Sequence, residues 1–507
     1  MIGGGREVKG QKTYATIAGK NGFGVTNENN AKTTDASIQP TLTPYANINV
    51  TGIGGALGGT PRSGSILLNF PSVPSGKSVY VRIANNTLTG IGGTFNAEPL
   101  NNLVPVPGTG KLVVGPDGFS YYVVKATGTF NGVQITATGN GGALGTTGTA
   151  NIDVHYAFYS SSDCGITLGT DWSAGPLGGT VYDQQLAIDG NPNTYSKLAP
   201  SALLSYVDQN FYFPESSTTP ITLTVSAPPK TGLSLGLLNN IIITAYNGTS
   251  ETKLWEAGAG TLLSLDLLQL LGDGTPTTFT LSPNVSFDRI KINYGSVANL
   301  FSEFYIREVK RTPSKPTFSS PTLQDLTSCS GVPITLTPIT PDSGNELRWY
   351  SSPTATTVLA TSNTYTPSPT VTTTYYVATA TISCTAESER VPVKVTINPI
   401  AGGTIATDQS ICPGTKPSTI TSAAPGTGTG TVTYQWQKSS GDNSHYTNIS
   451  GATALTYTEN SNLTQKTYYK RIATASHNGV VCSSGSNEVI ISIYPVPSHP
   501  SVNVNSN

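Results

Sequence analysis

The carboxy-terminal part of the chain contains a repeat, because the same landmarks recur in the same order in residues 325–398 and 399–495. Each stretch carries a cysteine, a tryptophan, a Thr-Tyr-Thr segment, a Tyr-Tyr pair, a second cysteine and a β-branched closing run. In sequence order these landmarks are Cys329, Trp349, TYTP (364–367), TTYY (373–376), Cys384 and VPVKVTINP, then Cys412, Trp436, TYTE (456–459), KTYY (466–469), Cys482 and EVIISIYP. Each stretch is therefore predicted to be one folding unit of the size of a small β-sandwich.

The remaining sequence alternates apolar and polar residues between Gly, Pro and Asn, which is typical of strands. The expected strands are Ser65–Phe70, Ser78–Ala84, Phe119–Thr127, Val133–Thr138, Asn151–Tyr159, Asn240–Tyr246, Thr277–Leu281, Phe287–Tyr294 and Glu303–Lys310. Residues 64–86 weakly resemble residues 210–229, and residues 130–159 weakly resemble residues 287–309. This weaker repeat indicates two further domains. The prediction is an all-β chain with domains at 12–161, 162–312, 325–398 and 399–495, a Pro/Ser linker at 313–324 and a tail at 496–507.

Composition excludes several functional classes. Only 11% of the residues are charged and the formal net charge is −1, so the excess of basic residues that nucleic acid binding requires is missing. The apolar runs are shorter than the roughly 18 residues that a membrane-spanning helix needs. None of the H-E-x-x-H, G-x-S-x-G or P-loop motifs occurs, and the acidic residues are scattered. We therefore expect a protein without enzymatic activity, nucleic acid partner or membrane span.

The repeat predicts how four of the five cysteines pair. We predict one disulfide within each repeat, Cys329–Cys384 and Cys412–Cys482, each worth about 4 kcal/mol through closure of a long loop. A metal site would need clustered ligands such as C-x-x-C, and these are missing from the sequence. Disulfides indicate an extracellular location. Cys164 is left over and is predicted to be an unpaired thiol.

The Cys–Trp–Cys order of both repeats resembles immunoglobulin-like (Ig-like) domains, in which Trp349 and Trp436 would pack across the core. Tyr375 and Tyr468 precede the second cysteine of each repeat by more than the two residues of the family pattern, so the disulfides are expected to tie strand or loop ends. With TTYYV and the closing V-x-I-x-P, residues 325–495 resemble Ig-like repeats of large Bacteroidota surface proteins exported by the type IX system, including gliding adhesins.

The segment LAIDGNPNTYSKL (186–198), followed much later by FDRIKI (287–292), resembles discoidin-like, galactose-binding-type jelly rolls. Domains 12–161 and 162–312 are accordingly expected to be jelly-roll-like. The resemblance implies a structural Ca²⁺ held by Asp189, Asn191 and Thr194, with Glu308 as a further ligand, since Ca²⁺ takes oxygen ligands from tight loops. The alternative is an Asx-rich turn in which the same side chains bond the backbone.

Glycan binding requires exposed aromatic faces beside polar groups at loop tips. The candidates are Trp172, which lies among turn residues, with Tyr182 and Tyr195.

The expected function is that of a non-catalytic, extracellular cell-surface adhesin or fibre segment. Its amino-terminal domains would contact a glycan, another surface protein or a second copy, and the Ig-like repeats would act as spacers. The alternatives are the glycan-binding region of a secreted carbohydrate-active enzyme and a self-assembling extracellular filament subunit.

Overall fold

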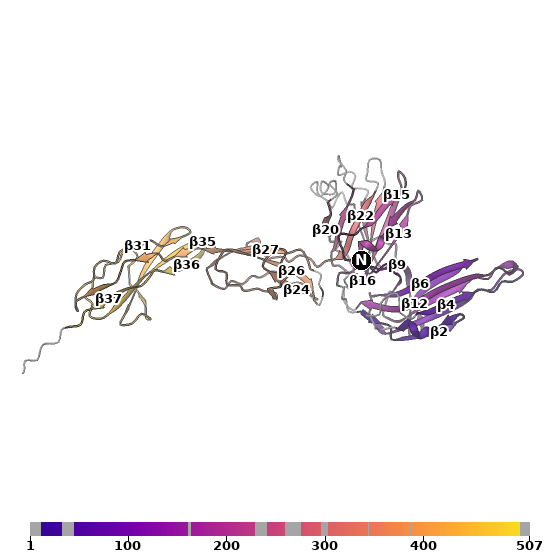
Figure 1. Ribbon diagram of the computed structural model, residues 1–507, viewed down its shortest axis with the longest axis horizontal. Coiled ribbons are helices and arrows are strands. Elements are labelled where there is room, and N and C mark those ends of the chain that lie inside the picture. Colours follow the sequence, from indigo (N-terminus) through magenta and orange to yellow (C-terminus); the bar gives the residue numbers. More distant parts are fainter. Residues whose placement is uncertain are drawn as a thin grey trace, which may run out of the picture. The chain divides into compact units, whose positions relative to one another are not determined.

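The computed structural model describes residues 12–32, 45–160, 164–228, 241–258, 275–295, 303–342, 344–382, 384 and 387–496. The chain is all-β, as predicted, and consists of tandem β-sandwiches (Figure 1). It divides into two compact units: Met1–Ser314 with Ala380–Ser388, and Lys315–Thr379 with Glu389–Asn507. Within the described residues, no helix is long and apolar enough to cross a membrane.

The first jelly roll is a sandwich of two antiparallel layers, with the short helices η1 (Glu28–Lys32) and η2 (Ala143–Gly145). Val81 of one layer and Ile135 of the other belong to the same buried core, because alternate residues of each strand point inward. One layer contains β1 (Lys12–Tyr14), β3 (Val25–Thr26), β4 (Ala46–Thr51), β6 (Ser78–Gly90), β9 (Gly108–Val114), β10 (Ser120–Ala126) and β12 (Gly148–Ser160). The other contains β2 (Ile17–Gly22), β5 (Arg62–Val73), β7 (Gly93–Asn101), β8 (Val104–Pro105) and β11 (Phe130–Gly139).

The second jelly roll repeats this arrangement around its own core, to which Phe211 and Ile306 contribute from opposite layers. One layer contains β13 (Gly169–Ala174), β16 (Tyr206–Ser217), β18 (Ile241–Tyr246), β19 (Trp255–Gly258) and β21 (Phe287–Gly295). The facing sheet has the order β14 (Gly179–Tyr182), β15 (Ser196–Pro200), β22 (Phe304–Arg311), β17 (Ile221–Ser226) and β20 (Thr277–Leu281), with η3 (Gln184–Ala187) before β15.

One twelve-stranded sheet runs through both jelly rolls, in the order β19-β18-β21-β16-β13-β9-β10-β6-β12-β4-β3, with β1 paired to β12. The join is the single pair Thr170↔Val114 between β13 and β9. Beside it lies a shared aromatic cluster that includes Tyr80, Tyr121, Phe158 and Tyr212. The jelly rolls therefore share a buried junction.

In each Ig-like domain, a strand near the amino-terminal end pairs in parallel with the last strand. Trp349 and Trp436 are fully buried, as predicted, and their indole N–H groups donate to the carbonyl oxygens of Ser362 (3.1 Å) and Ala454 (2.9 Å). The first domain follows η4 (Pro321–Gln324) and has the order β23 (Asp325–Cys329), β27 (Val391–Asn398), β26 (Thr373–Thr381), β24 (Asn345–Tyr350) and β25 (Ala360–Thr361).

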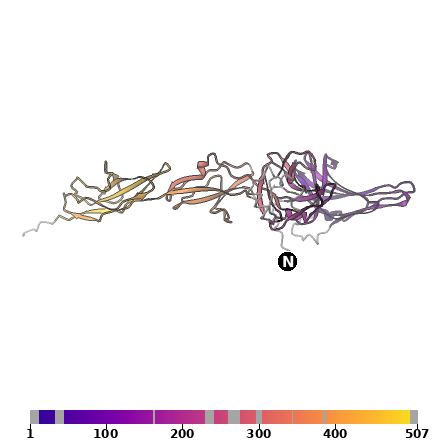
Figure 2. The ribbon, with the colours of Figure 1, turned by 90° about the horizontal axis from the view of Figure 1, so that it is seen from above.

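The main sheet of the second Ig-like domain has the order β30-β37-β35-β33-β34, with β36 paired to β35. Figure 2 shows its long strands from above, in yellow. Its strands are β28 (Ile400–Ala401), β29 (Thr404–Ile405), β30 (Gln409–Ile411), β31 (Ser422–Ala424), β32 (Thr427–Gly428), β33 (Val432–Ser440), β34 (Thr447–Asn448), β35 (Thr467–His477), β36 (Val480–Gly485) and β37 (Val489–Ile493).

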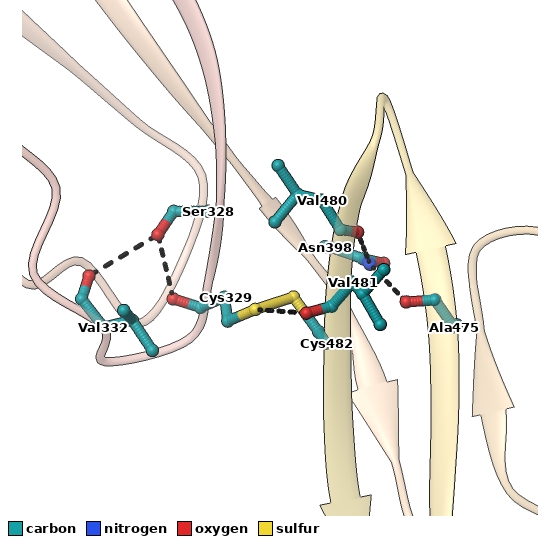
Figure 3. Close-up of a disulfide and its surroundings, with 8 residues drawn as sticks. All are labelled: Ser328, Cys329, Val332, Asn398, Ala475, Val480, Val481 and Cys482. Atoms are coloured by element: carbon teal, nitrogen blue, oxygen red, sulfur yellow. Dashed lines mark hydrogen bonds between the residues drawn. A yellow bond between two sulfur atoms is a disulfide. The ribbon is translucent and has the colours of Figure 1, made fainter. Parts of the chain in front are cut away.

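The predicted disulfide pairing is wrong. One bond is Cys329–Cys482 (Figure 3). The other is Cys164–Cys384, and Cys412 is the free, exposed cysteine. The predicted unpaired thiol, Cys164, is therefore bonded.

Strand register explains why neither predicted bond forms. Cys329 lies beside Asn398 at the end of β27, whereas Cys384 follows β26, whose Val377 pairs with Val391 at the start of β27. Eight residues of strand separate these ends by about 25 Å, and a disulfide joins Cα atoms about 4.4–6.8 Å apart. In the second domain, Cys412 likewise follows Ile411, which pairs with the end of β37. Cys482 lies opposite Ala475, beyond the start of β37.

Candidate functional site in the second jelly roll

The loop between η3 and β15 is closed by hydrogen bonds of its own side chains. Asp189 Oδ1 accepts from the backbone N–H of Asn191 at 2.9 Å, and the Thr194 hydroxyl donates to Asp189 Oδ2 at 2.8 Å. The amide oxygen of Asn191 accepts from the N–H of Asn193 at 3.1 Å. Gly190 has a φ of +75°, which a glycine adopts without steric cost. These contacts match the predicted alternative of an Asx-rich turn.

Glu308 is the feature of this region that an Asx turn does not explain. The side chain is buried, and its Oε2 atom has no hydrogen-bond partner. Burial raises the pKa of Glu308 to about 7, the negative charge of Asp189 adds to the rise, and Lys310 and the Gly190 N–H oppose it. Arg307 is an extra residue in the pairing of β22 with β17, and such a bulge re-aims the next side chain. The bulge therefore accounts for a carboxyl on the buried side of β22 near Asp189.

The arrangement fits a calcium ion by the chemistry of its donors. Asp189, Thr194 and Glu308 supply carboxylate and hydroxyl oxygens, and the unpartnered Glu308 oxygen and its raised pKa indicate an uncompensated negative group. The Asn191 amide oxygen is turned toward its own loop. In the described part of the chain, no group of three or more His, Cys, Asp or Glu side chains gathers as a metal site. A calcium ion here would therefore depend on neutral oxygens as well.

A second cluster, which we call the tyrosine face, lies on the outer side of the sheet β14-β15-β22. Tyr182 pairs with Lys197, and Lys197 pairs with Tyr305, so these side chains are cross-strand neighbours. The Lys197 ammonium lies 4.5 Å from the centre of the Tyr182 ring. Tyr195 stacks on Tyr305 with ring centres 4.5 Å apart. The face comprises Tyr182, Tyr195, Lys197, Glu303, Tyr305 and Arg307.

The carboxylate of Glu303 connects the charged and aromatic members of the tyrosine face. It accepts from Lys197 Nζ at 3.0 Å and from the Tyr305 hydroxyl at 2.7 Å. The Tyr305 hydrogen bond and Lys197 lower the pKa of Glu303 despite partial burial, and Glu303 raises that of Lys197. Burial and Glu303 raise the pKa of Tyr305 to about 12. At neutral pH the face therefore presents the carboxylate of Glu303, the cation of Lys197 and the neutral phenol of Tyr305.

Arg307 joins the tyrosine face to the Asp189 loop. Its guanidinium donates to the carbonyl oxygen of Pro192 at 3.2 Å and to the hydroxyl of Ser226 at 2.8 Å. The same group lies 5.2 Å from the centre of the Tyr195 ring. The loop that holds the predicted calcium ligands thus also positions Tyr195.

The structure brings two of the three predicted ligand-binding aromatics together. Tyr182 and Tyr195 belong to the tyrosine face and are half-exposed. Trp172 is also half-exposed but lies on the twelve-stranded sheet, opposite Gln209. The sequence reasoning missed Lys197, Glu303, Tyr305 and Arg307. The alternation of Tyr305 and Arg307 in a strand was the available signal, but it does not identify the neighbouring strand.

Comparison with solved structures gives likenesses of low score. The three N-terminal domains of the bacteriophage RB49 highly immunogenic outer capsid protein match at 10% identity, covering 63% of this chain and 100% of theirs, with a TM-score of 0.23. A fucose binding module of Streptococcus pneumoniae matches at 15% identity, 30% and 99% coverage and a TM-score of 0.21. The CBM32-1 module of a family 31 glycoside hydrolase from Clostridium perfringens matches at 17% identity, 28% and 93% coverage and a TM-score of 0.20. At these scores the likenesses carry no argument about ligand.

Comparison with protein families and curated proteins concerns the carboxy-terminal half. No curated protein matches the chain. A domain family of unknown function, DUF8696, matches residues 401–495. Residues 313–399 are similar to the Ig-like domain family described as CHU_C associated.

Proposed function

We propose that this chain is a non-catalytic contact region of an extracellular surface protein, of the adhesin or fibre type, that binds a glycan through the tyrosine face. The Ig-like domains act as spacers. The observation that carries the proposal is the exposure of stacked tyrosine rings beside a fixed carboxylate and two cations on one sheet face. The two disulfides support an oxidising, extracellular location.

The chemistry of the tyrosine face suits a carbohydrate. A sugar ring has an apolar C–H face, which packs on an aromatic ring, and a rim of hydroxyls, which needs donors and acceptors. Tyr182 and Tyr195 supply ring faces, Glu303 accepts hydrogen bonds, and Lys197 and Arg307 donate them. The face as defined holds one carboxylate, whereas most glycoside hydrolases use two. Binding therefore accounts for it better than hydrolysis.

Calcium would act on the same face indirectly. Bound by Asp189, Thr194 and Glu308, it would hold the loop whose Pro192 carbonyl meets Arg307 and whose next residues lead to Tyr195. Its role would be to keep Tyr195 in place for stacking.

A glycan array tests the main proposal. The full chain should bind a restricted set of glycans, and Tyr195→Ala and Tyr305→Ala should each weaken binding about tenfold, because each change removes one ring of the Tyr195–Tyr305 stack, an aromatic contact worth roughly 0.5–1.5 kcal/mol, together with the ring surface offered to the sugar. Tyr305→Ala also removes the hydroxyl that donates to Glu303. Tyr494→Ala, an exposed tyrosine of the second Ig-like domain, is the matched control and should bind normally. An array without signal, or binding that survives both tyrosine changes, would refute the proposal.

Calcium removal tests the supporting ion. EDTA should lower the Tm of the unit that contains the jelly rolls, and excess Ca²⁺ should restore it. Asp189→Ala and Glu308→Gln should make that Tm insensitive to EDTA, whereas Asp325→Ala, in the first Ig-like domain, should not. If EDTA leaves the Tm of the unaltered chain unchanged, the calcium site does not exist.

The alternatives predict different behaviour in the same preparations. A filament subunit would associate with itself at a concentration-dependent rate, which light scattering measures. The glycan-binding region of a carbohydrate-active enzyme would bind on the array, but in its full-length protein it would be accompanied by a catalytic domain.

A further inference from the structure

Cys412 occupies the same place in the second Ig-like domain that Cys329 occupies in the first. Cys329 ends β23 and lies beside Asn398, the last residue of the parallel partner β27. Cys412 follows β30, whose Ile411 pairs with Ile493 at the end of β37. The N–H of Tyr494, the next residue, donates to the carbonyl oxygen of Ile411 at 2.9 Å. Cys412 and Tyr494 are therefore the counterparts of Cys329 and Asn398.

In the first Ig-like domain this position binds a hairpin of the domain that follows. Cys329 is bonded to Cys482, which lies on β36 of the hairpin β35–β36 (Figure 3). The Asn398 amide donates to the carbonyl oxygens of Ala475 (3.2 Å) and Val480 (3.4 Å), on the two strands of the hairpin. Asn398 is fully buried there.

The tip of the hairpin also takes part in this contact. Asn478 and Gly479 have φ values of 49° and 79°, the signature of a tight two-residue turn. The Asn478 amide donates to the hydroxyl of Thr327 at 3.2 Å, two residues before Cys329. The docking site thus consists of a cysteine, a hydroxyl two residues earlier and the residue that ends the partner strand.

The second Ig-like domain presents the same three elements uncovered. Cys412 is free and exposed, and Ser410 supplies an exposed hydroxyl two residues before it. Tyr494 is 55% exposed, whereas its counterpart Asn398 is 0% exposed. The surface that a hairpin covers in one domain is therefore open in the next.

The other disulfide follows the same order along the chain. Cys384 lies between Ala380 and Glu387, which are joined by an antiparallel β-bridge in the first Ig-like domain, and it bonds Cys164 at the start of the preceding jelly roll. In both bonds a hairpin cysteine of an Ig-like domain reaches back to a cysteine of the domain before it. Both disulfides therefore run from an Ig-like domain back to the domain that precedes it.

We propose that Cys412, Ser410 and Tyr494 form the docking site for the β-hairpin of a further Ig-like domain of the same kind, which closes through a disulfide between Cys412 and the hairpin cysteine. In that step two thiols lose two protons and two electrons, and a small-molecule disulfide such as oxidised glutathione accepts them and becomes two thiols. Cys384 and Cys482 are already bonded, so the hairpin cysteine comes from a domain outside the described residues.

The test extends the chain by a second copy of residues 400–495 directly after Pro495, which reproduces the spacing from Asn398 through Pro399 into the second domain. One conservative substitution in each cysteine-containing peptide of the added copy distinguishes these peptides by mass from those of the first copy. After incubation with a glutathione redox buffer, non-reducing peptide mapping should find Cys412 of the first copy bonded to Cys482 of the added copy. Alkylation should then label Cys412 of the added copy alone. Cys482→Ser in the added copy is the control and should leave Cys412 of the first copy free to alkylate.

Two results would overturn the proposal. One is a first-copy Cys412 that stays alkylatable while Cys329–Cys482 has formed, and the other is a bond between Cys412 and Cys482 within the added copy. Peptide mapping of the natural protein provides a measurement that does not depend on the folding of the extended chain. Cys412 joined to an Ig-like hairpin cysteine supports the docking site, and Cys412 recovered as a thiol or as a Cys412–Cys412 dimer contradicts it.

Discussion

The two junctions between neighbouring domains of like fold are built differently. Between the jelly rolls, one sheet continues from β9 to β13, an aromatic cluster is buried, and Lys125 of β10 pairs with Asp288 of β21. Between the Ig-like domains, a disulfide and the buried amide of Asn398 hold a hairpin in place. The first junction has a buried aromatic cluster and is stabilised by burial, whereas the second is held by a covalent bond and by hydrogen bonds of a buried amide.

The jelly-roll junction also contains a buried pair of opposite charges. In a chain with only 11% charged residues, Lys125 and Asp288 are 14% and 3% exposed at the jelly-roll junction, and Lys125 also donates to Ser216 (2.7 Å) and Asn247 (2.9 Å). A buried pair of this kind stabilises only while all partners are present. The first junction should therefore be sensitive to single substitutions, and the second to reduction.

Removal of the buried cation should have the largest effect. Lys125→Met should destabilise the jelly-roll unit by about 3–5 kcal/mol, because the buried Asp288 loses its cation and keeps the N–H of Gly248 as a hydrogen-bond donor. Urea unfolding measures this loss. Lys111→Met, which removes an exposed partner of Asp171 at the same junction, is the control and should cost less than about 1 kcal/mol. Equal costs for the two changes would mean that the junction does not depend on the buried pair.

Acid should weaken the jelly-roll unit next. Burial and Arg82 lower the pKa of His155 from 6.5 to about 4, and Asp153 opposes the shift. The unfolded chain binds a proton in this window that the folded chain does not, so stability is lost as the pH falls from about 6.5 to 4, by about 3 kcal/mol. Thermal unfolding at several pH values measures the loss, and His155→Gln should remove this dependence. A His155→Gln variant with the same pH dependence would contradict the assignment.

Opening the Ig-like junction should have a smaller effect on stability. In the double variant Cys329→Ser, Cys482→Ser, each domain keeps its own core, and the junction loses about 2 kcal/mol because the short linker already holds its ends close. Hydrogen exchange should become faster at Val480–Gly485 and unchanged at Trp349. Loss of protection throughout both domains would show that they fold as one unit rather than as two joined by a bond.

The smallest effect on stability should come from the loss of a single hydrogen bond at the jelly-roll junction. The Tyr80 hydroxyl donates to the carbonyl oxygen of Phe213 at 3.2 Å across the two domains. Tyr80→Phe keeps the ring in the aromatic cluster and should cost about 1 kcal/mol in urea unfolding. A cost above that of Lys125→Met would reverse the assigned order of contributions.

Local pattern predicted the strands and the core of each domain but not the contacts between distant segments. Trp349 and Trp436 are buried because their order among strand-forming residues places them inside a sandwich. The disulfides were predicted wrongly because repetition shows which cysteines are equivalent, not which ends of a strand they occupy. The sequence predicted only part of the tyrosine face, because Tyr195 and Tyr305 are far apart in sequence and are brought together by the register of β15 and β22.

The sequence by itself determined the all-β class and the repeat, because alternation, turn residues and recurring landmarks are local properties that each segment carries alone. Only the tertiary structure decided the partner of each cysteine and the continuation of one sheet through both jelly rolls. It also decided that a β-bulge places the Glu308 side chain on the buried side of β22. The physical reason is that pairing register and domain contact are set by the relative positions of strands that the chain order does not specify.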